Sequence, residues 1–140
     1  MGRRCVHACT PHFRVPTLMP VHWLQAYGLR RQICSFIDSN PNLMISDSPM
    51  KEWVLWDSGS SVSAYSRRMA QGSVWGGGIE MAAVAHMKRC NVFVYQANGG
   101  GFKRISSFEF NPQAKVVRVL YGGGVHYDAL EVTSRPGSRY

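Results

Sequence analysis

The feature that most constrains this sequence is a glycine turn followed by a helical pattern and a continuous apolar run. Gly76–Gly78 lack Cβ atoms, so the backbone there can turn tightly into a helix. From Ile79 to Lys88 apolar residues recur at three-to-four spacing, and the alanines among them allow close packing on a sheet. Val92–Tyr95 follows without a polar interruption, which is typical of a central strand. The stretch predicts a helix packed on the central strand of a sheet.

Two further strands are predicted near the carboxyl end of the chain. Val116–Tyr121 and Val125–Val132 are rich in β-branched residues, and only Gly122–Gly124 separates them, which predicts a hairpin. Because side chains alternate along a strand, His126 and Asp128 are expected to share one face of the second strand. His126 would then lie just after a glycine turn, where the edge of a sheet can open onto a cleft.

Three helices are expected in the first half of the chain. They are predicted within Val21–Asp38, from Pro49 to the Asp57–Gly59 stop, and from Ser60 or Ser61 to Gly72.

Side chains in and after these helices carry specific expectations. Ser48 is placed to cap the second helix, and Pro49 suits its first position. Trp56 is expected on the buried stripe of that helix, and Trp75 is expected to anchor the next helix in the core. Helices followed by hairpins predict an α+β domain with a small, mostly antiparallel sheet.

Length and charge narrow the class of protein. With 140 residues the chain is expected to form one domain, and it contains no apolar run of the ~20 residues needed to cross a bilayer. A cytoplasmic or nuclear location is expected, with a transit peptide as an alternative because residues 1–28 contain no acidic residue. The glycine runs lack the Lys-Ser/Thr ending of a phosphate loop, and no cofactor is expected. A net charge of +8 keeps nucleic-acid binding open as a rival function, although the basic residues are spread along the chain.

The four cysteines divide into two pairs. Cys5 and Cys9 alternate with His7 and His12, and these four side chains could hold zinc, but the simpler interpretation is an irregular basic leader without a metal. Cys34 lies mid-helix beside apolar residues, and Cys90 abuts the predicted central strand, so both are expected to pack in the core.

Five segments of the sequence, taken in order, resemble motifs of the ovarian-tumour (OTU) family of cysteine proteases. The resembling segments are W-G-G-G-I-E-M-A-A-V-A, N-V-F-V-Y and V-L-Y-G-G-G-V-H-Y-D-A-L, with L-R-R-Q-I-C-S-F-I-D-S-N-P and Y-S-R-R-M-A upstream, and together they cover Leu29–Leu130. The resemblance implies a papain-like thiol hydrolase that removes ubiquitin from proteins, with ubiquitin or a ubiquitin conjugate as partner and His126 as general base. Asp128, on the same strand face, is the candidate to orient the imidazole.

One block of that family is not found in this sequence. The family's nucleophile lies in an Asp-Gly-x-Cys-Leu-Phe segment before the L-R-R motif, and neither Cys5 nor Cys9 has such neighbours. Cys9 is the candidate nucleophile by its distance from that motif, and an unrelated leader cysteine is the alternative. We therefore expect a leader over residues 1–28, an OTU-like domain over 29–133 and a tail over 134–140. Hydrolysis would be impaired or absent, with a non-catalytic ubiquitin-binding module as the alternative function.

Overall fold

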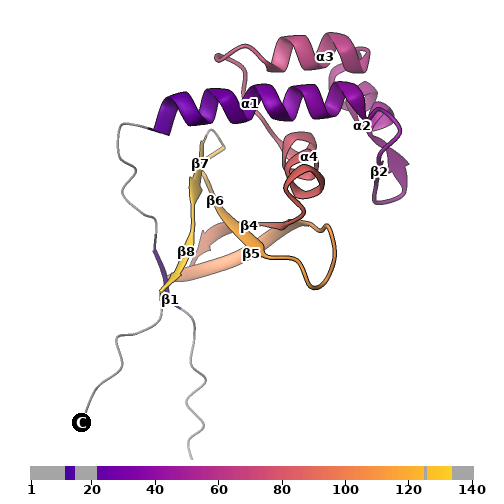
Figure 1. The fold of residues 1–140 in the computed structure, drawn as a ribbon. Helices are drawn as coiled ribbons and strands as arrows, with labels where there is room; N and C mark the ends of the chain where they lie inside the picture. Colours follow the sequence, from indigo (N-terminus) through magenta and orange to yellow (C-terminus); the bar gives the residue numbers. More distant parts are fainter. Residues whose placement is uncertain (1–11, 15–21, 125, 134–140) are drawn as a thin grey trace, which may run out of the picture.

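The fold has helices on one side and a twisted sheet on the other. A computed structural model describes residues 12–14, 22–124 and 126–133. Figure 1 shows the helices gathered above the sheet. The helices are α1 (His22–Ser39), α2 (Met50–Ser58), α3 (Val62–Met69) and α4 (Gly78–Lys88). The expected α+β class is confirmed.

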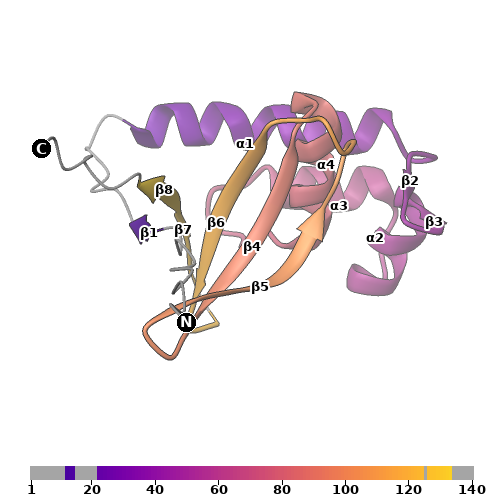
Figure 2. The same ribbon diagram turned by 90° about the horizontal axis from the view of Figure 1, so that it is seen from below.

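The principal sheet has the strand order β5-β4-β6-β7. Its strands are β4 (Asn91–Asn98), β5 (Gly101–Phe108), β6 (Val116–Gly122) and β7 (His126–Ala129). The β4–β5 and β6–β7 pairs are antiparallel, whereas β4 and β6 are parallel. Figure 2 shows β4 between its two neighbours, with β7 beyond β6. The expectation of a mostly antiparallel sheet is confirmed, and β6 and β7 form the expected hairpin.

Four short strands lie outside this sheet. They are β1 (His12–Arg14), which pairs with β8 (Glu131–Thr133), and β2 (Met44–Ile45), which pairs with β3 (Ser48–Pro49). The single strand expected over Val125–Val132 is thus divided at Leu130, which is buried and donates its amide to the Arg118 carbonyl.

The core follows the predicted periodicities closely. Ile37 from α1 and Met50 and Val54 from α2 are fully buried, together with Tyr65 and Met69 from α3. On α4, the small alanine side chains are buried and bring the helix against β4, where Val92 packs on Ala85. Helix α4 therefore joins the helical cluster to the sheet.

Four local expectations are wrong. Ser48 does not cap α2; it pairs with Ile45 in a hairpin, and Pro49 occupies the cap position with no side-chain hydrogen bond. Trp56 is 62% exposed, because two residues after Val54 a helix has turned to its opposite face. Trp75 is 69% exposed rather than a core anchor.

Candidate functional site

The candidate catalytic pair lies on β7, directly after a glycine turn. Gly123 and Gly124 take positive φ angles of 61° and 83°, a conformation that side chains with a Cβ rarely adopt. The turn places His126 opposite Gly122 on β6, as the first residue of the returning strand. The backbone thus fixes where the imidazole emerges from the sheet.

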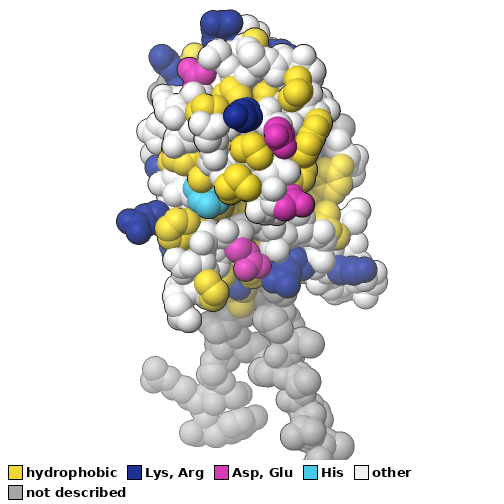
Figure 3. All heavy atoms as spheres, turned by 90° about the vertical axis from the view of Figure 1, so that its right-hand side faces the viewer, with side chains coloured by type: hydrophobic (Ala, Val, Ile, Leu, Met, Phe, Trp, Pro, Cys, Tyr) yellow, Lys and Arg dark blue, Asp and Glu magenta, His cyan; other side chains and the backbone are white. Residues whose placement is uncertain are grey.

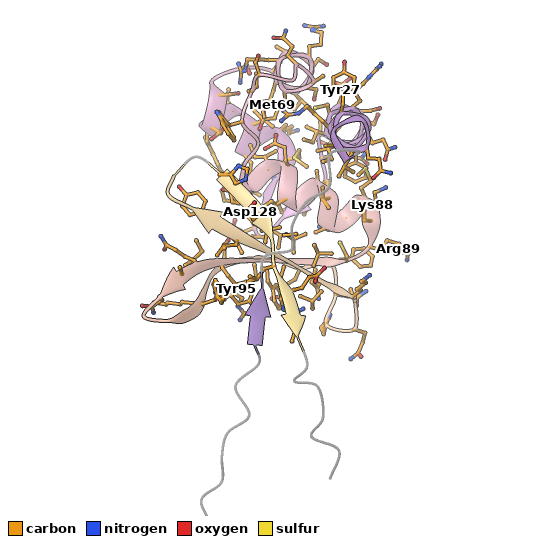
Figure 4. The ribbon with its side chains drawn as sticks, turned by 90° about the vertical axis from the view of Figure 1, so that its left-hand side faces the viewer. Tyr27, Met69, Lys88, Arg89, Tyr95 and Asp128 are labelled. Carbon is orange, nitrogen blue, oxygen red and sulfur yellow. The ribbon has the colours of Figure 1, made fainter. Side chains whose placement is uncertain are left out.

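The imidazole of His126 contacts the carboxylate of Asp128. The His126 Nε2 and Asp128 Oδ1 atoms are 3.0 Å apart, and Figure 4 shows Asp128 on β7 in front of the helices. A carboxylate only accepts hydrogen bonds, so a neutral imidazole in this contact carries its proton on Nε2 and leaves Nδ1 with the lone pair. Nδ1 is therefore the atom that can take a proton from a neighbouring acid such as a thiol.

Exposure differs between the two members of the pair. The side chain of His126 is 59% exposed and that of Asp128 is 31% exposed. We expected a cleft beside His126, but the apolar cavity of the helical half, described below, does not include this residue. The ring is open to solvent on the edge strand of the sheet.

The two cysteines among the described residues lie in the core. Cys34 is 5% exposed within the helical cluster, and Cys90 is 6% exposed beside Ala85 and Val92. Burial raises the pKa of the Cys34 thiol, and the Glu80 carboxylate adds to the rise while Arg30 opposes it. Burial also raises the pKa of the Cys90 thiol, against the opposing effect of Lys115. Both expectations of core packing are confirmed, and neither thiol is disposed to ionise.

These environments predict slow reaction of both thiols with alkylating reagents. Because the thiolate is the reactive species and burial lowers its population, iodoacetamide at pH 8 should modify Cys34 and Cys90 at least about tenfold more slowly in the native chain than in urea. Mass spectrometry of peptides from timed samples measures each site separately. Equal rates with and without urea would contradict the buried positions of the two sulfur atoms.

Cys5 and Cys9 lie outside the described residues, as does His7 of the alternative zinc set. The role of Cys9 as nucleophile therefore stays a prediction. Within the described parts of the chain there is no group of three or more His, Cys, Asp or Glu side chains that could hold a metal ion. None of the helices in those parts is both long and apolar enough to span a membrane.

The segment that carries the triple glycine is held from two sides. The Arg30 guanidinium donates from Nη1 to the Met69 carbonyl at 3.0 Å and to the Val74 carbonyl at 2.7 Å. From the other side, the Glu80 carboxylate accepts the Tyr65 hydroxyl at 2.5 Å and the Gly77 amide at 2.7 Å. The exposed indole of Trp75 therefore stands on a backbone that is fixed at both ends.

Arg30 and the partners of Glu80 were not identifiable from sequence. Arg30 lies on the face of α1 that also carries Ile33 and Cys34, and the sequence pattern does not show that the carbonyl groups of Met69 and Val74 accept its hydrogen bonds. Glu80 lies in the first turn of α4, where the helix dipole favours a carboxylate. The hydrogen bonds to Tyr65 and Gly77 add a second role, which is to secure the glycine turn.

An apolar cavity lies beside this segment. It measures about 460 Å³ and lies between α1, α3 and α4; six of its lining residues are Tyr27, Leu29, Ile33, Cys34, Met69 and Glu80. Tyr27 and Leu29 are exposed at 49% and 38%. In Figure 4, Tyr27 and Met69 lie in the helical half above Asp128. The cavity therefore belongs to the helical half of the domain.

Comparison with solved structures shows the same fold in several OTU domains. An OTU domain in complex with ubiquitin has a TM-score of 0.56 and 16% identity, covering 84% of this chain and 69% of that chain. The viral OTU domain protease from Qalyub virus has a TM-score of 0.61 and 12% identity, covering 86% and 85%. The Hazara virus OTU bound to ubiquitin has a TM-score of 0.51 and 15% identity, covering 88% and 83%.

Comparison with curated proteins gives no match. The sequence model of the family described as OTU-like cysteine protease, however, matches residues 24–127. The matched segment includes His126 and lies wholly after Cys9. Because it spans most of the chain and the fold agrees, this chain belongs to the family of OTU-like cysteine proteases.

Proposed function

We propose that this chain is a ubiquitin-binding OTU domain in which thiol hydrolysis is impaired. The ubiquitin partner is supported by family membership and by the similarity to OTU structures that hold ubiquitin. The impairment is supported by one observation: the His126–Asp128 pair is present, while both described cysteines are buried with raised thiol pKa values.

Hydrolysis of an isopeptide bond by this chemistry requires a thiolate near the imidazole. The base removes the thiol proton, the sulfur attacks the carbonyl carbon, and the imidazolium returns the proton to the departing amine. His126 Nδ1 is free to act as that base while Asp128 holds Nε2. Cys34, which is 5% exposed at the wall of the apolar cavity, and Cys90, which is 6% exposed, both belong to apolar clusters and do not provide an exposed thiolate.

A ubiquitin probe with a carboxyl-terminal vinyl sulfone tests this proposal with the full chain. We expect reversible binding of ubiquitin, measured by fluorescence anisotropy, without a covalent adduct in mass spectrometry. An adduct at Cys9 would overturn the impairment and support an active hydrolase. Absence of ubiquitin binding would overturn the proposed partner.

A matched pair of variants assigns any adduct that does form. If Cys9 is the nucleophile and His126 its base, Cys9→Ser should abolish the adduct, and His126→Ala should slow its formation by about 10²-fold or more. Labelling that is unaffected by His126→Ala would show reaction of an accessible thiol without the proposed pair. Since His126 is exposed, this substitution is not expected to unfold the chain.

A further inference from the structure

A groove lies at the end of the molecule opposite β7. It consists of two cavities of about 540 Å³ and 310 Å³ that share Ile45, Ser46, Ser107 and Phe108. Its walls come from β2, α2, α4 and the last residues of β5. Figures 1 and 2 both place α2 and β2 at the far end of the molecule from β7. The groove is therefore separate from the His126–Asp128 pair.

Aromatic side chains give the groove a fixed apolar surface. Trp53 and Trp56 line the larger cavity with ring centroids 5.4 Å apart in an edge-to-face arrangement. The Trp53 indole is held in place because its Nε1 donates to the Ile45 carbonyl at 3.0 Å. In Figure 3, hydrophobic side chains gather across this end of the molecule. An exposed aromatic surface on a small domain is typical of a binding site.

The charge of the groove is opposite to that of the whole chain. Of these two cavities, Asp57 lines the larger and Glu109 the smaller, and no Lys or Arg among the described residues lines either of them. The only other titratable group of the lining is His86, whose ring packs edge-to-face against Phe110. Arg68 lines a neighbouring cavity together with Asp57, and its guanidinium lies over the Tyr65 ring. In a chain of net charge +8, the groove thus presents two carboxylates that form no ion pair with a described residue.

A sheet edge borders the same groove. Within the described sheet β5 has one neighbour, β4, so the other side of β5 has no strand partner. Ser106, Ser107 and Phe108 at its end line the larger cavity. Val94 pairs with Ser106, whereas Tyr95 pairs with Arg104, so Ile105 forms a bulge in β5. This bulge interrupts the edge of β5 before Ser106. The regular end of β5 thus offers backbone donors and acceptors to an extended segment.

We propose that this groove binds an extended segment of a partner protein whose groove-facing side chains include both apolar residues and Lys or Arg. The backbone of the segment pairs with the end of β5, its apolar side chains contact Trp53, Trp56 and Phe108, and its cations approach Asp57 and Glu109. Because successive side chains of a strand point to opposite faces, every second residue of the segment faces the groove. The site goes beyond ubiquitin binding and does not depend on it.

A fluorescein-labelled ten-residue peptide with serine at every second position, and valine and lysine in turn at the others, tests the proposal by anisotropy with the full chain. We expect saturable binding that weakens with salt. A peptide with glutamate in place of lysine should bind at least tenfold more weakly, and so should one with N-methylated backbone amides. Asp57→Asn and Glu109→Gln, both at exposed residues, should each lower the affinity about three- to fivefold.

Gln71→Lys is the matched control, since it changes the net charge by the same amount at an exposed residue outside the groove. Its effect on affinity should stay below about twofold. Equal affinities for the lysine and glutamate peptides, or equal losses for Gln71→Lys and Asp57→Asn, would overturn the proposal. A dimer in sedimentation that the lysine peptide dissociates would make a second copy of this chain the occupant and overturn the assignment to a partner protein. Ubiquitin binding should be unchanged in all three variants.

Discussion

Asn91→Ala is expected to lower the free energy of unfolding by about 3 kcal/mol. Asn91 is 3% exposed at the start of β4 and holds the turn after β5. Its Nδ2 donates to the Asn111 carbonyl at 2.8 Å, and its Oδ1 accepts the Phe110 and Asn111 amides at 2.8 and 3.3 Å. Alanine would leave three backbone groups without these partners, and each buried group that stays unpaired costs about 1–3 kcal/mol. Water would replace part of the loss, because Asn111 is exposed.

Urea unfolding followed by tryptophan fluorescence measures this loss. Asn98→Ala is the matched control, since it makes the same chemical change at an exposed residue of the β4–β5 turn and should change stability by about 0.5 kcal/mol or less. Similar values for the two variants would show that the side chain of Asn91 does not support the turn.

Glu80→Ala should also destabilise the domain strongly, by about 3 kcal/mol. The substitution removes the acceptor of the buried Tyr65 hydroxyl and of the Gly77 amide. Burial, and then the hydrogen bond to Glu80, raise the pKa of the Tyr65 phenol well above its ordinary value, so the phenol stays protonated and keeps its proton for this bond. Release of Gly77 should also loosen the segment that carries Trp75.

Glu52→Ala separates the effect of charge from the effect of these hydrogen bonds. Glu52 lies in the first turn of α2 as Glu80 does in α4, and its loss should cost about 0.3–1 kcal/mol through the helix dipole alone. Tyr65→Phe combined with Glu80→Ala in a double-mutant cycle should show a coupling of about 1 kcal/mol or more. Additive effects of the two substitutions would contradict a direct Tyr65–Glu80 interaction.

Elements with a strong single period were predictable from the sequence. The α4–β4 stretch has the apolar spacing of a helix and then an unbroken run of β-branched and aromatic residues. At these lengths the first pattern is typical of a helix and the second of a buried strand. The period of two predicted that His126 and Asp128 share a face of the strand, whereas their contact at 3.0 Å needed the structure.

Features that depend on a distant partner were not predictable. Ser48 has the local properties of a helix cap, but Ile45 competes for its backbone in a two-stranded hairpin. Trp75 is apolar and adjoins a helix, yet the hydrogen bonds of Arg30 fix its segment at the surface. Trp53 and Trp56 stand three residues apart and share a groove that only the arrangement of α2, α4 and β5 creates.

The position of β7 in the sheet has a consequence for the dynamics of the imidazole. This strand is outermost, and its ladder with β6 comprises four residue pairs. Local opening of β7 therefore requires the loss of a short ladder and of the hydrogen bond from the Leu130 amide to the Arg118 carbonyl. The strands β4, β5 and β6 keep their own pairing. A ligand that contacts His126 only in the paired state would favour that state by mass action, so occupancy of the site and protection of β7 amides from solvent exchange would rise together.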